Sequence, residues 1–365
     1  QKRKLDQINY LKSLGHFNCS IDEEAIIIPD EEEYFNYRCS KECISALDLF
    51  LAWGRNHKEM LIKKYPDLKA KIISAGNSRI DILKNKKNYE SVASDIKNKY
   101  GEFILFVTKY GRYNLKKRGW DSWLDMKLAN NPNLSKNSYD RIEKSIEFEK
   151  KNMQLTMKTI KKMAKDFPDK QILIRPHPTE NIDTWNEFAE SSKCSNIKIT
   201  FTSQSLNPWL LAAEHIISTN CTSSLESIIM GIPSINYIPY SDSEMEYDLP
   251  KLCSHTLRSY KEIKSVFKNK KKIIIDKKNL EKYIQNFGEN SFCDFLFSFL
   301  VDNLDQSIYS KRNSHLSGFI LFFHKKYKNF RKFISLNFGP LRRRKEIVKQ
   351  KCPGFTINSV KKIAH

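Results

Sequence analysis

The chain has 365 residues, of which 63 are Lys or Arg and 42 are Asp or Glu, so its formal net charge is +21. Its length predicts two domains of ordinary size. A hydrophobic content of 40% with 12% aromatic residues excludes global disorder, and no apolar run approaches the ~20 residues needed to span a bilayer.

Apolar runs of strand length recur between helical patterns along the chain. Several are continuous blocks of Ile, Leu, Val and Phe, which is typical of strands buried on both faces of a parallel sheet. The predicted strands, in chain order, are Ala25–Ile28, Leu49–Trp53, Lys71–Ala75, Phe103–Thr108, Gln171–Arg175, Ile197–Phe201, His215–Ser218, Ser234–Ile238 and Lys272–Ile275. Helices are predicted over Asp140–Phe167 and Ser223–Met230. This alternation predicts an α/β fold.

A domain boundary is predicted between Asn85 and Tyr100, where Lys, Asn and Ser dominate. Residues 1–100 then form an N-terminal α/β domain, residues 101–285 a second one, and residues 286–365 a basic, mostly helical region. The first domain is short for a doubly wound fold, and the chain opens on Gln1 rather than Met, without a signal peptide. We therefore expect that N-terminal units of the domain are missing.

The eight cysteines are scattered, and none forms a C-x-x-C. The one close pair, Cys39 and Cys43, has helical spacing but lacks a second pair to complete a zinc site. Free thiols in a reducing cytoplasm are therefore expected.

Positive charge is concentrated at the carboxyl end of the chain. Residues 311–365 hold 15 Lys and Arg against one acid, Glu346, and so carry +14 of the +21. Such charge predicts an anionic partner, which is a nucleic acid, an acidic ligand or a membrane surface. Phe and Tyr residues among the cations suit an interfacial helix on anionic lipid. A helix that is solvated or packs over the N-terminal domain, and a nucleic-acid arm, remain as alternatives.

A polar loop follows the predicted strand Gln171–Arg175. It carries Arg175, His177, Glu180 and Asn181, and Pro178 helps to fix its backbone. Ligands of open α/β sheets bind beyond the carboxyl ends of strands, and Arg and His can bind phosphate or a nucleobase there. The alternative is a rigid turn whose histidine caps neighbouring backbone groups.

A hydroxyl-rich loop follows the predicted strand His215–Ser218. Its candidate ligand-binding residues are Thr219, Asn220, Thr222, Ser223, Ser224 and Glu226. Free N–H groups at the start of the following helix, with hydroxyls beside them, make an anion site. The same residues are also favoured as an ordinary N-cap.

Two further loops carry candidate residues. Glu23 and Glu24 precede the predicted strand Ala25–Ile28, where a carboxylate could act as general base for a hydroxyl, unless these acids are only part of a solvated acidic loop. A fourth loop follows Phe103–Thr108 and could bind a donor carboxylate or an acceptor, or be a basic surface turn; its candidate residues are Thr108, Lys109, Arg112 and Asn114.

Three signatures of other nucleotide enzymes are missing from the sequence. It contains no G-x-x-x-x-G-K-[ST], no G-x-G-x-x-G and no Asp-x-Asp. A metal-independent phosphate site built from helix ends and basic side chains is therefore expected.

These loops resemble those of GT-B-type glycosyltransferases of bacterial surface carbohydrate (capsule and lipopolysaccharide) biosynthesis. The resemblance runs from about Leu11 to Leu300. It extends to the sialyltransferases and Kdo (3-deoxy-manno-octulosonic acid) transferases, which use CMP-activated sugars and carry a paired acid followed by glycine, a His-Pro and a Ser-Ser. The matching residues here are Glu23-Glu24, His177-Pro178 and Ser223-Ser224, with Ala25 in the place of the glycine.

The resemblance implies two Rossmann-like domains facing a cleft, the first on the acceptor side and the second binding the nucleotide sugar. It implies transfer of an acidic sugar from a CMP-activated donor to a glycan or glycolipid, without a metal or other cofactor. Glu23 or Glu24 would be the general base, His177 would contact or protonate the departing phosphate, and Ser223 and Ser224 would hold it.

Two other functions are compatible with the same loops. A CDP-glycerol or CDP-ribitol phosphotransferase of teichoic-acid type resembles the chain in its His-Pro and Ser-Ser loops. A non-catalytic membrane-binding protein derived from a GT-B enzyme is the second alternative, because Ala25 departs from the family pattern. In the favoured interpretation the protein works on the cytoplasmic face of the inner membrane, bound peripherally through residues 311–365, and no nucleic-acid partner is expected.

Overall fold

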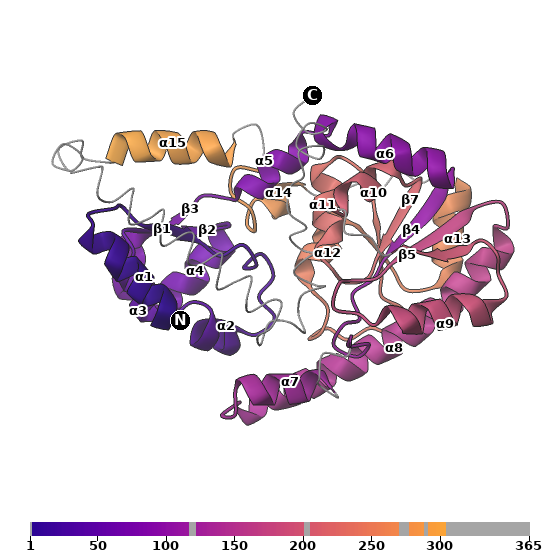
Figure 1. Ribbon diagram of the computed structural model, residues 1–365, viewed down its shortest axis with the longest axis horizontal. Helices are drawn as coiled ribbons and strands as arrows, with labels where there is room; N and C mark the ends of the chain where they lie inside the picture. The colour runs from indigo at the N-terminus through magenta and orange to yellow at the C-terminus, as the bar shows by residue number, and fades with distance from the viewer. Residues whose placement is uncertain (1, 117–121, 201–204, 270–276, 288–290, 304–365) are drawn as a thin grey trace, which may run out of the picture. The chain divides into compact units, whose positions relative to one another are not determined.

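The computed structural model describes residues 2–116, 122–200, 205–269, 277–287 and 291–303. These residues divide into two compact units, each with its own parallel sheet (Figure 1). Unit 1 runs to Ile82 and includes the described part of the segment that starts at Lys278, whereas unit 2 runs from Leu83 to Lys277. Within these ranges no helix is both long enough and apolar enough to cross a lipid bilayer.

Unit 1 has a three-stranded parallel sheet in the order β1-β2-β3. Its elements are α1 (Lys2–Ser13), β1 (Cys19–Ile21), α2 (Glu31–Tyr37), α3 (Lys41–Ala46), β2 (Leu49–Ala52), α4 (Arg55–Lys64), the 3-10 helix η1 (Pro66–Lys71), β3 (Ile72–Ser74), α5 (Ser78–Lys84), α14 (Lys277–Leu280) and α15 (Phe292–Asn303). The last two residues of α5, Leu83 and Lys84, and the first residue of α14, Lys277, belong to unit 2.

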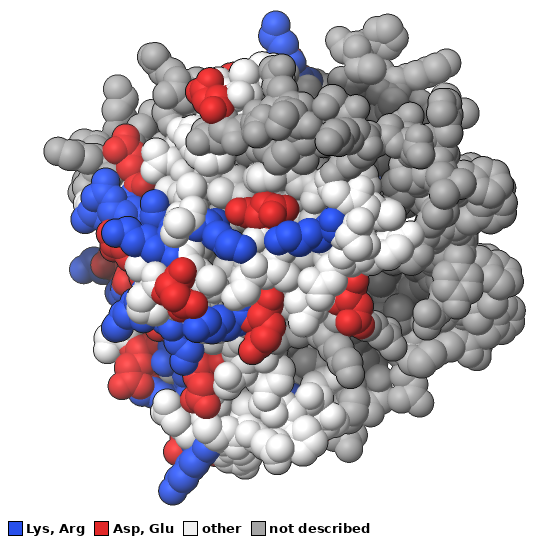
Figure 2. Space-filling view, turned by 90° about the vertical axis from the view of Figure 1, so that its left-hand side faces the viewer, with Lys and Arg blue, Asp and Glu red and all other residues white. Residues whose placement is uncertain are grey.

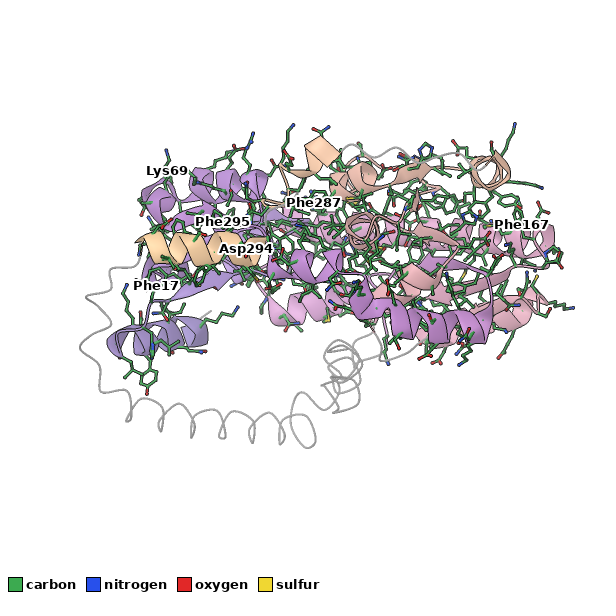
Figure 3. The ribbon with its side chains drawn as sticks, turned by 90° about the horizontal axis from the view of Figure 1, so that it is seen from above. Phe17, Lys69, Phe167, Phe287, Asp294 and Phe295 are labelled. Carbon is green, nitrogen blue, oxygen red and sulfur yellow. The ribbon has the colours of Figure 1, made fainter. Side chains whose placement is uncertain are left out.

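Helix α15 covers one face of the sheet of unit 1. Leu49 and Leu51 of β2 pack with Phe292 and with Phe295, which Figure 3 labels on this helix. On the other face of β2 the ring of Phe50 contacts the ring of His57 from α4. Alternate residues of β2 thus face opposite layers, which explains why its sequence is apolar throughout.

Unit 2 has a six-stranded, wholly parallel sheet in the order β6-β5-β4-β7-β8-β9, the order of a doubly wound Rossmann fold. Its elements are α6 (Lys87–Tyr100), β4 (Phe103–Val107), α7 (Trp123–Asn130), α8 (Lys136–Asp166), β5 (Gln171–Arg175), α9 (Ile182–Ser192), β6 (Ile197–Ile199), α10 (Asn207–Ala212), β7 (His215–Ser218), α11 (Ser223–Ile229), β8 (Ile235–Tyr237), α12 (Asp248–Cys253), β9 (His255–Leu257) and α13 (Tyr260–Asn269).

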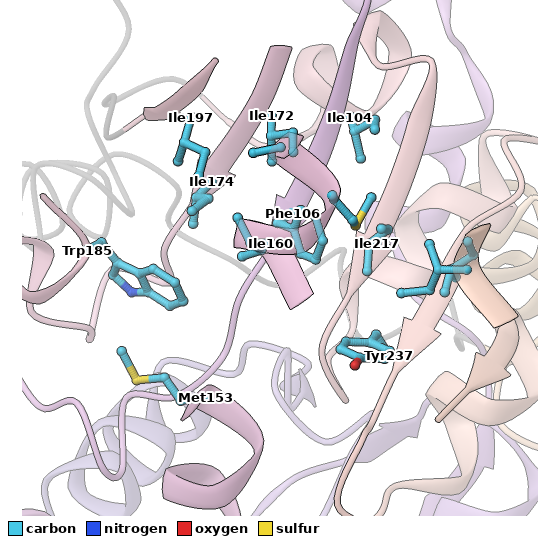
Figure 4. Packing of buried hydrophobic residues seen from close by; sticks show 14 of the residues in the cluster. Ile104, Phe106, Met153, Ile160, Ile172, Ile174, Trp185, Ile197, Ile217 and Tyr237 are labelled. Carbon is cyan, nitrogen blue, oxygen red and sulfur yellow. The ribbon is translucent and has the colours of Figure 1, made fainter. Parts of the chain in front are cut away.

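Helices cover both faces of this sheet. Ile104 and Phe106 of β4 join a buried cluster with Ile160 of α8 and Trp185 of α9 (Figure 4). The intervening Phe103, Leu105 and Val107 join a second cluster, in which they pack with α6 and α10. The α/β prediction is confirmed, and the continuous apolar strands are explained by burial on two faces.

The division between the units falls at Ile82–Leu83 and not at the predicted residue 100. The reason is that Ala93 and Ile96 of α6 pack with Trp209 in the core of unit 2. Residues 292–303, which belong to the predicted helical C-terminal region, form the helix that covers the sheet of unit 1, as in the alternative in which that region packs on the N-terminal domain. The rest of that predicted region, residues 304–365, lies outside the described residues.

The predicted strand Ala25–Ile28 is wrong. The first strand is β1, and the chain turns directly after it, with the Ala25 N–H donating to the Asp22 carbonyl oxygen. The indole of Trp53 donates to that same oxygen and holds the turn against β2. As a consequence, Glu23 and Glu24 follow a strand instead of preceding one. Strand β9 was not predicted, and the predicted strand Lys272–Ile275 lies outside the described residues.

The face shown in Figure 2 carries Lys and Arg interspersed with Asp and Glu over its described part. Because both signs of charge occur together there, the described part of this face shows no surface of a single charge sign.

Candidate functional site

A pocket that is open to solvent lies in unit 2, at the carboxyl ends of β4, β7 and β8. Strands β4 and β7 are neighbours at the point where the strand order of the sheet reverses. Open α/β sheets bind ligands at this position, because the loops of the two strands diverge there. The lining residues are Lys109, Tyr110, Arg112, Phe148, Glu149, Asn152, Thr219, Asn220, Tyr237, Ile238, Met245 and Tyr247.

Two cations of the loop after β4 share this pocket with a carboxylate and a phenol. The Lys109 ammonium lies 4.2 Å from the ring centroid of Tyr247. The Arg112 guanidinium donates to the Tyr247 hydroxyl at 3.1 Å and lies 3.8 Å from the carboxylate of Glu149. The Arg112 backbone N–H also donates to Glu149 at 2.7 Å. The pocket therefore holds two positive charges that are only partly balanced.

The electrostatics of the pocket are visible in two shifted pKa values. Burial raises the pKa of Glu149, although Arg112 and Lys109 act to lower it. For Tyr247, burial acts to raise the pKa, but the charges of Lys109 and Arg112 outweigh it, so this pKa lies below its ordinary value. The lowered pKa of Tyr247 thus reports the positive potential of Lys109 and Arg112, whereas at Glu149 burial outweighs that potential.

Met245 and Tyr247 form one wall of the pocket, and two buried or half-buried amides fix the segment from Tyr240 to Tyr247 that carries them. Asn152 of α8 donates to the Tyr240 carbonyl and accepts from the Tyr240 N–H, both at 3.0 Å. Asn220 donates to the Met245 carbonyl at 3.0 Å and accepts from the Tyr247 N–H at 2.9 Å. Asn220 holds a φ of +50°, a left-handed conformation that Asn tolerates better than most residues.

His177 lies in the loop after β5 and is not one of the residues that line the pocket. Its Nδ1 accepts from the Thr179 backbone N–H at 3.2 Å and lies 2.7 Å from the Thr179 hydroxyl. A neutral His177 ring therefore carries its proton on Nε2. The histidine thus binds a neighbouring backbone group, as in the rigid turn that was the alternative prediction for this loop.

Glu180 is completely buried and connects this loop to the loop after β4. One carboxylate oxygen accepts from the Thr108 hydroxyl and the His177 N–H, and the other accepts from the Trp185 indole, all at 2.9 Å. Burial raises the pKa of Glu180 to about 7, against these hydrogen bonds. Glu180 and Thr108 thus brace the loops from within.

The remaining predicted residues of the His177 loop also make internal contacts. The buried guanidinium of Arg175 lies 5.2 Å from the ring centroid of Trp209, and burial lowers the pKa of Arg175 to about 10. Asn181 caps α9, accepting from the Asp183 N–H, while Asn114 donates to the Asn181 carbonyl at 3.0 Å. Pro178 is half-buried in the same turn.

The loop after β7 divides between the pocket and the interior. Thr219 and Asn220 line the pocket. The predicted helix is confirmed as α11, but Thr222 makes no side-chain cap bond. The Ser223 hydroxyl lies 2.6 Å from the Cys221 sulfur, and the Ser224 hydroxyl donates to the Cys221 carbonyl at 2.9 Å. Together with Glu226, both serines are buried.

In unit 1 the paired acids follow β1, where the loops of the parallel strands meet. Glu23 accepts a hydrogen bond at 2.9 Å from the side chain of Asn77, which follows β3. The Glu24 N–H donates to Asp22, whose carboxylate is paired with Arg38. The carboxyl ends of β1 and β3 therefore share one polar contact.

Sequence reasoning missed Glu149, Tyr247, Asn152 and Asn77. Glu149 had a recognisable signal, because it occupies the inward stripe of α8 between the buried Ile142 and Met153. No pattern distinguishes the others from surface residues. In the described part of the chain no group of three or more His, Cys, Asp and Glu is placed to hold a metal ion.

No family model matches the chain, and no curated protein matches it either. Several solved structures do match the chain. The UDP-GlcNAc 2-epimerase of Methanocaldococcus jannaschii matches with a TM-score of 0.50 at 12% identity, covering 81% of this chain and 74% of the epimerase. A complex of the same enzyme with UDP-GlcNAc and UDP gives a TM-score of 0.42 at 14% identity, and the match covers 71% of this chain and 62% of that one.

The wall teichoic acid polymerase TagF matches with a TM-score of 0.38 at 14% identity, covering 73% of this chain and 59% of the polymerase. This chain thus spans about three fifths of the length of that protein. The likeness to the epimerase at a TM-score of 0.50 shows the fold, an α/β protein with parallel sheets of GT-B-like type.

Proposed function

We propose that this chain is a GT-B-like glycosyltransferase that binds a nucleotide-activated sugar in the pocket of unit 2. The observation that carries the proposal is the position of Lys109 and Arg112 in a pocket at the switch point of a doubly wound sheet. Basic side chains beside the carboxyl ends of strands bind phosphate through charge-assisted hydrogen bonds. The fold and the charge of the pocket both support this assignment.

The donor that we propose is a CMP-activated acidic sugar of the Kdo or sialic-acid type. Such a donor presents one phosphate and one carboxylate, and the pocket presents two cations to them, with Thr219 and Asn220 beside them. Both anionic groups can then be bound without a metal ion or another cofactor. In this scheme His177, in the loop after β5, contacts the departing phosphate.

The proposed reaction transfers the sugar to a hydroxyl of a glycan or lipid-linked glycan. The acceptor oxygen forms a bond to the anomeric carbon, and the bond from that carbon to the phosphate oxygen breaks, its electron pair leaving with CMP. The hydroxyl proton passes to a carboxylate of the Glu23-Glu24 pair in unit 1. Residues 311–365 would hold the enzyme peripherally on the cytoplasmic face of the inner membrane, through anionic lipid.

Acceptor-dependent CMP release with a donor panel tests this function. The panel contains CMP-Kdo, CMP-sialic acid, CDP-glycerol and UDP-GlcNAc, and turnover is expected with a CMP-sugar. Turnover with CDP-glycerol would instead identify the phosphotransferase, turnover with UDP-GlcNAc alone would exclude the cytidine donor, and no turnover with any donor would refute the enzyme.

The chain offers a matched control for the pocket. Lys109 and Lys151 each lie over a tyrosine of the same wall, at 4.2 Å from Tyr247 and 4.5 Å from Tyr240, but Lys151 does not line the pocket. We expect Lys109→Ala to raise the KM for the donor by about 10-fold, since a hydrogen bond to a charged group contributes about 1.5–3 kcal/mol. Lys151→Ala should leave KM unchanged, and equal effects of both changes would place the donor elsewhere.

A further inference from the structure

The adjacent acids Glu23 and Glu24 have different surroundings, although the sequence does not separate them. Both side chains are exposed and can therefore reach a substrate. Glu23 is bonded to Asn77 at 2.9 Å through its Oε2. Among the described residues, the Oε1 of Glu23 and the carboxylate of Glu24 accept no hydrogen bond. Glu24 interacts only electrostatically with Arg38, whose guanidinium donates to Asp22.

The hydrogen bonds of Asn77 fix the orientation of its side-chain amide. Its Oδ1 accepts from the Arg79 backbone N–H at 2.8 Å, so the Nδ2 donor must face Glu23. Asn77 is 1% exposed, and the preceding Gly76 has a φ of +83° with no room for a Cβ beside the Gln285 carbonyl. The donor is therefore held by a rigid, buried turn.

A general base needs one oxygen to accept the proton and a fixed orientation toward the hydroxyl. Glu23 meets both requirements, because Oε2 is anchored while Oε1 stays open to a substrate. A carboxylate without such an anchor samples several rotamers, and loss of orientation by about 1 Å can cost about 100-fold in rate.

We propose that Asn77 is a positioning residue that makes Glu23, and not Glu24, the general base toward the acceptor hydroxyl. The assignment rests on the proposed function, since it presumes transfer to a hydroxyl. The assignment goes beyond the proposed function because it names Glu23 as the base and Asn77 as the residue that orients it.

Asn77→Asp tests the contact, because it is isosteric. Its Oδ1 can still accept from the Arg79 N–H, while a carboxylate oxygen replaces the donor that faces Glu23. We expect kcat to fall by about 10- to 100-fold with the donor KM unchanged. Glu23→Gln should lower kcat by about 100-fold or more, and Glu24→Gln by much less.

A double-variant comparison separates positioning from a merely structural role. In Glu23→Gln, Asn77→Asp should cause no further loss of kcat, because the base is already gone. The glutamine can donate to the new aspartate, so this pair should also recover the Tm that Asn77→Asp loses. Combined with Glu24→Gln, Asn77→Asp should keep its full effect on kcat, and Tm should not recover.

Four results would overturn the inference. Equal losses from Asn77→Asp in all backgrounds would make Asn77 structural only, and a greater loss from Glu24→Gln would place the base at Glu24; in both cases the proposed function survives. Absence of turnover in the unmodified protein would refute the proposed function together with the base, whereas absence of the Tm recovery would refute the contact itself.

Discussion

Replacing Glu180 by Gln should change the pH dependence of stability in a direction that the structure fixes. The pKa of this carboxyl is raised by burial from 4.5 to about 7. A shift of this size corresponds to roughly 3 kcal/mol, at about 1.4 kcal/mol for each pKa unit. The folded state binds this proton more tightly than the unfolded state does. Protonated Glu180 therefore contributes to the free energy of unfolding, fully below pH 4.5, and this contribution is lost as pH rises through 7.

The Gln variant cannot ionise, so it does not lose this contribution. Its amide must turn a donor toward Trp185 or toward Thr108 and His177, which costs about 1–3 kcal/mol at every pH. The free energy of unfolding of the natural protein, minus that of Glu180→Gln, should therefore fall by roughly 3 kcal/mol between pH 4.5 and pH 7. Urea unfolding followed by tryptophan fluorescence at several pH values measures this difference.

Glu246→Gln supplies a control of opposite sign. Burial acts to raise the pKa of Glu246, but hydrogen bonds from Arg258 and Ser241 outweigh it, and the pKa is lowered. The stability that Glu246 contributes is thus present above its unfolded pKa and is lost on acidification, so the cost of Glu246→Gln should shrink as pH falls. A difference for Glu180→Gln that stays constant between pH 4.5 and pH 7 would refute burial of an ionisable carboxyl at this position.

Three further changes test other parts of the structure. Gly111→Ala places a Cβ 2.0 Å from the Thr179 hydroxyl oxygen, so we expect a lower Tm. Because the Thr179 side chain contacts His177, we also expect a lower kcat. An unchanged Tm would contradict this packing. Asn220→Gly and Asn220→Ala both remove the side-chain hydrogen bonds to the Met245 carbonyl and from the Tyr247 N–H. Only the alanine variant adds about 1 kcal/mol of left-handed strain, so it should be the less stable in urea unfolding; the opposite order would argue against the strain. Changing Arg342–Lys345 to Gln in the full chain should weaken co-sedimentation with anionic vesicles by up to about 1000-fold at low salt, at about 1 kcal/mol per cation, and binding to duplex DNA instead of vesicles would favour the nucleic-acid arm.

The fold of unit 2 was largely predictable because its strands are buried on both faces. Blocks such as Phe103–Val107 have no polar residue that could face solvent, and a continuous apolar run of that length admits few other structures. Strand β1 was not predicted, for the opposite reason. It is three residues long and half exposed, so its pairing with β2 is decided by tertiary contacts such as that of Trp53 with Asp22.

The candidate site was predictable in place but only partly in detail. Loops after strands were expected to carry it, and Lys109, Arg112, Thr219 and Asn220 do line one pocket. The serines of α11 were expected to face a ligand, but a hydroxyl bonds backbone and substrate equally well, and the local sequence does not say which is nearer. Those contacts are set by the tertiary fold.

Buried polar side chains, more than exposed ones, show where this fold keeps its loops rigid. A buried amide or carboxylate is costly unless every polar atom finds a partner, so it persists where its hydrogen bonds fix something that apolar packing cannot. Asn152 fixes the wall of the pocket, Glu180 joins the loops after β4 and β5, and Asn77 holds Glu23. All three act on loops at the carboxyl ends of strands, where a parallel sheet presents its ligands. That shared position connects the interior of each unit to the chemistry proposed for its surface.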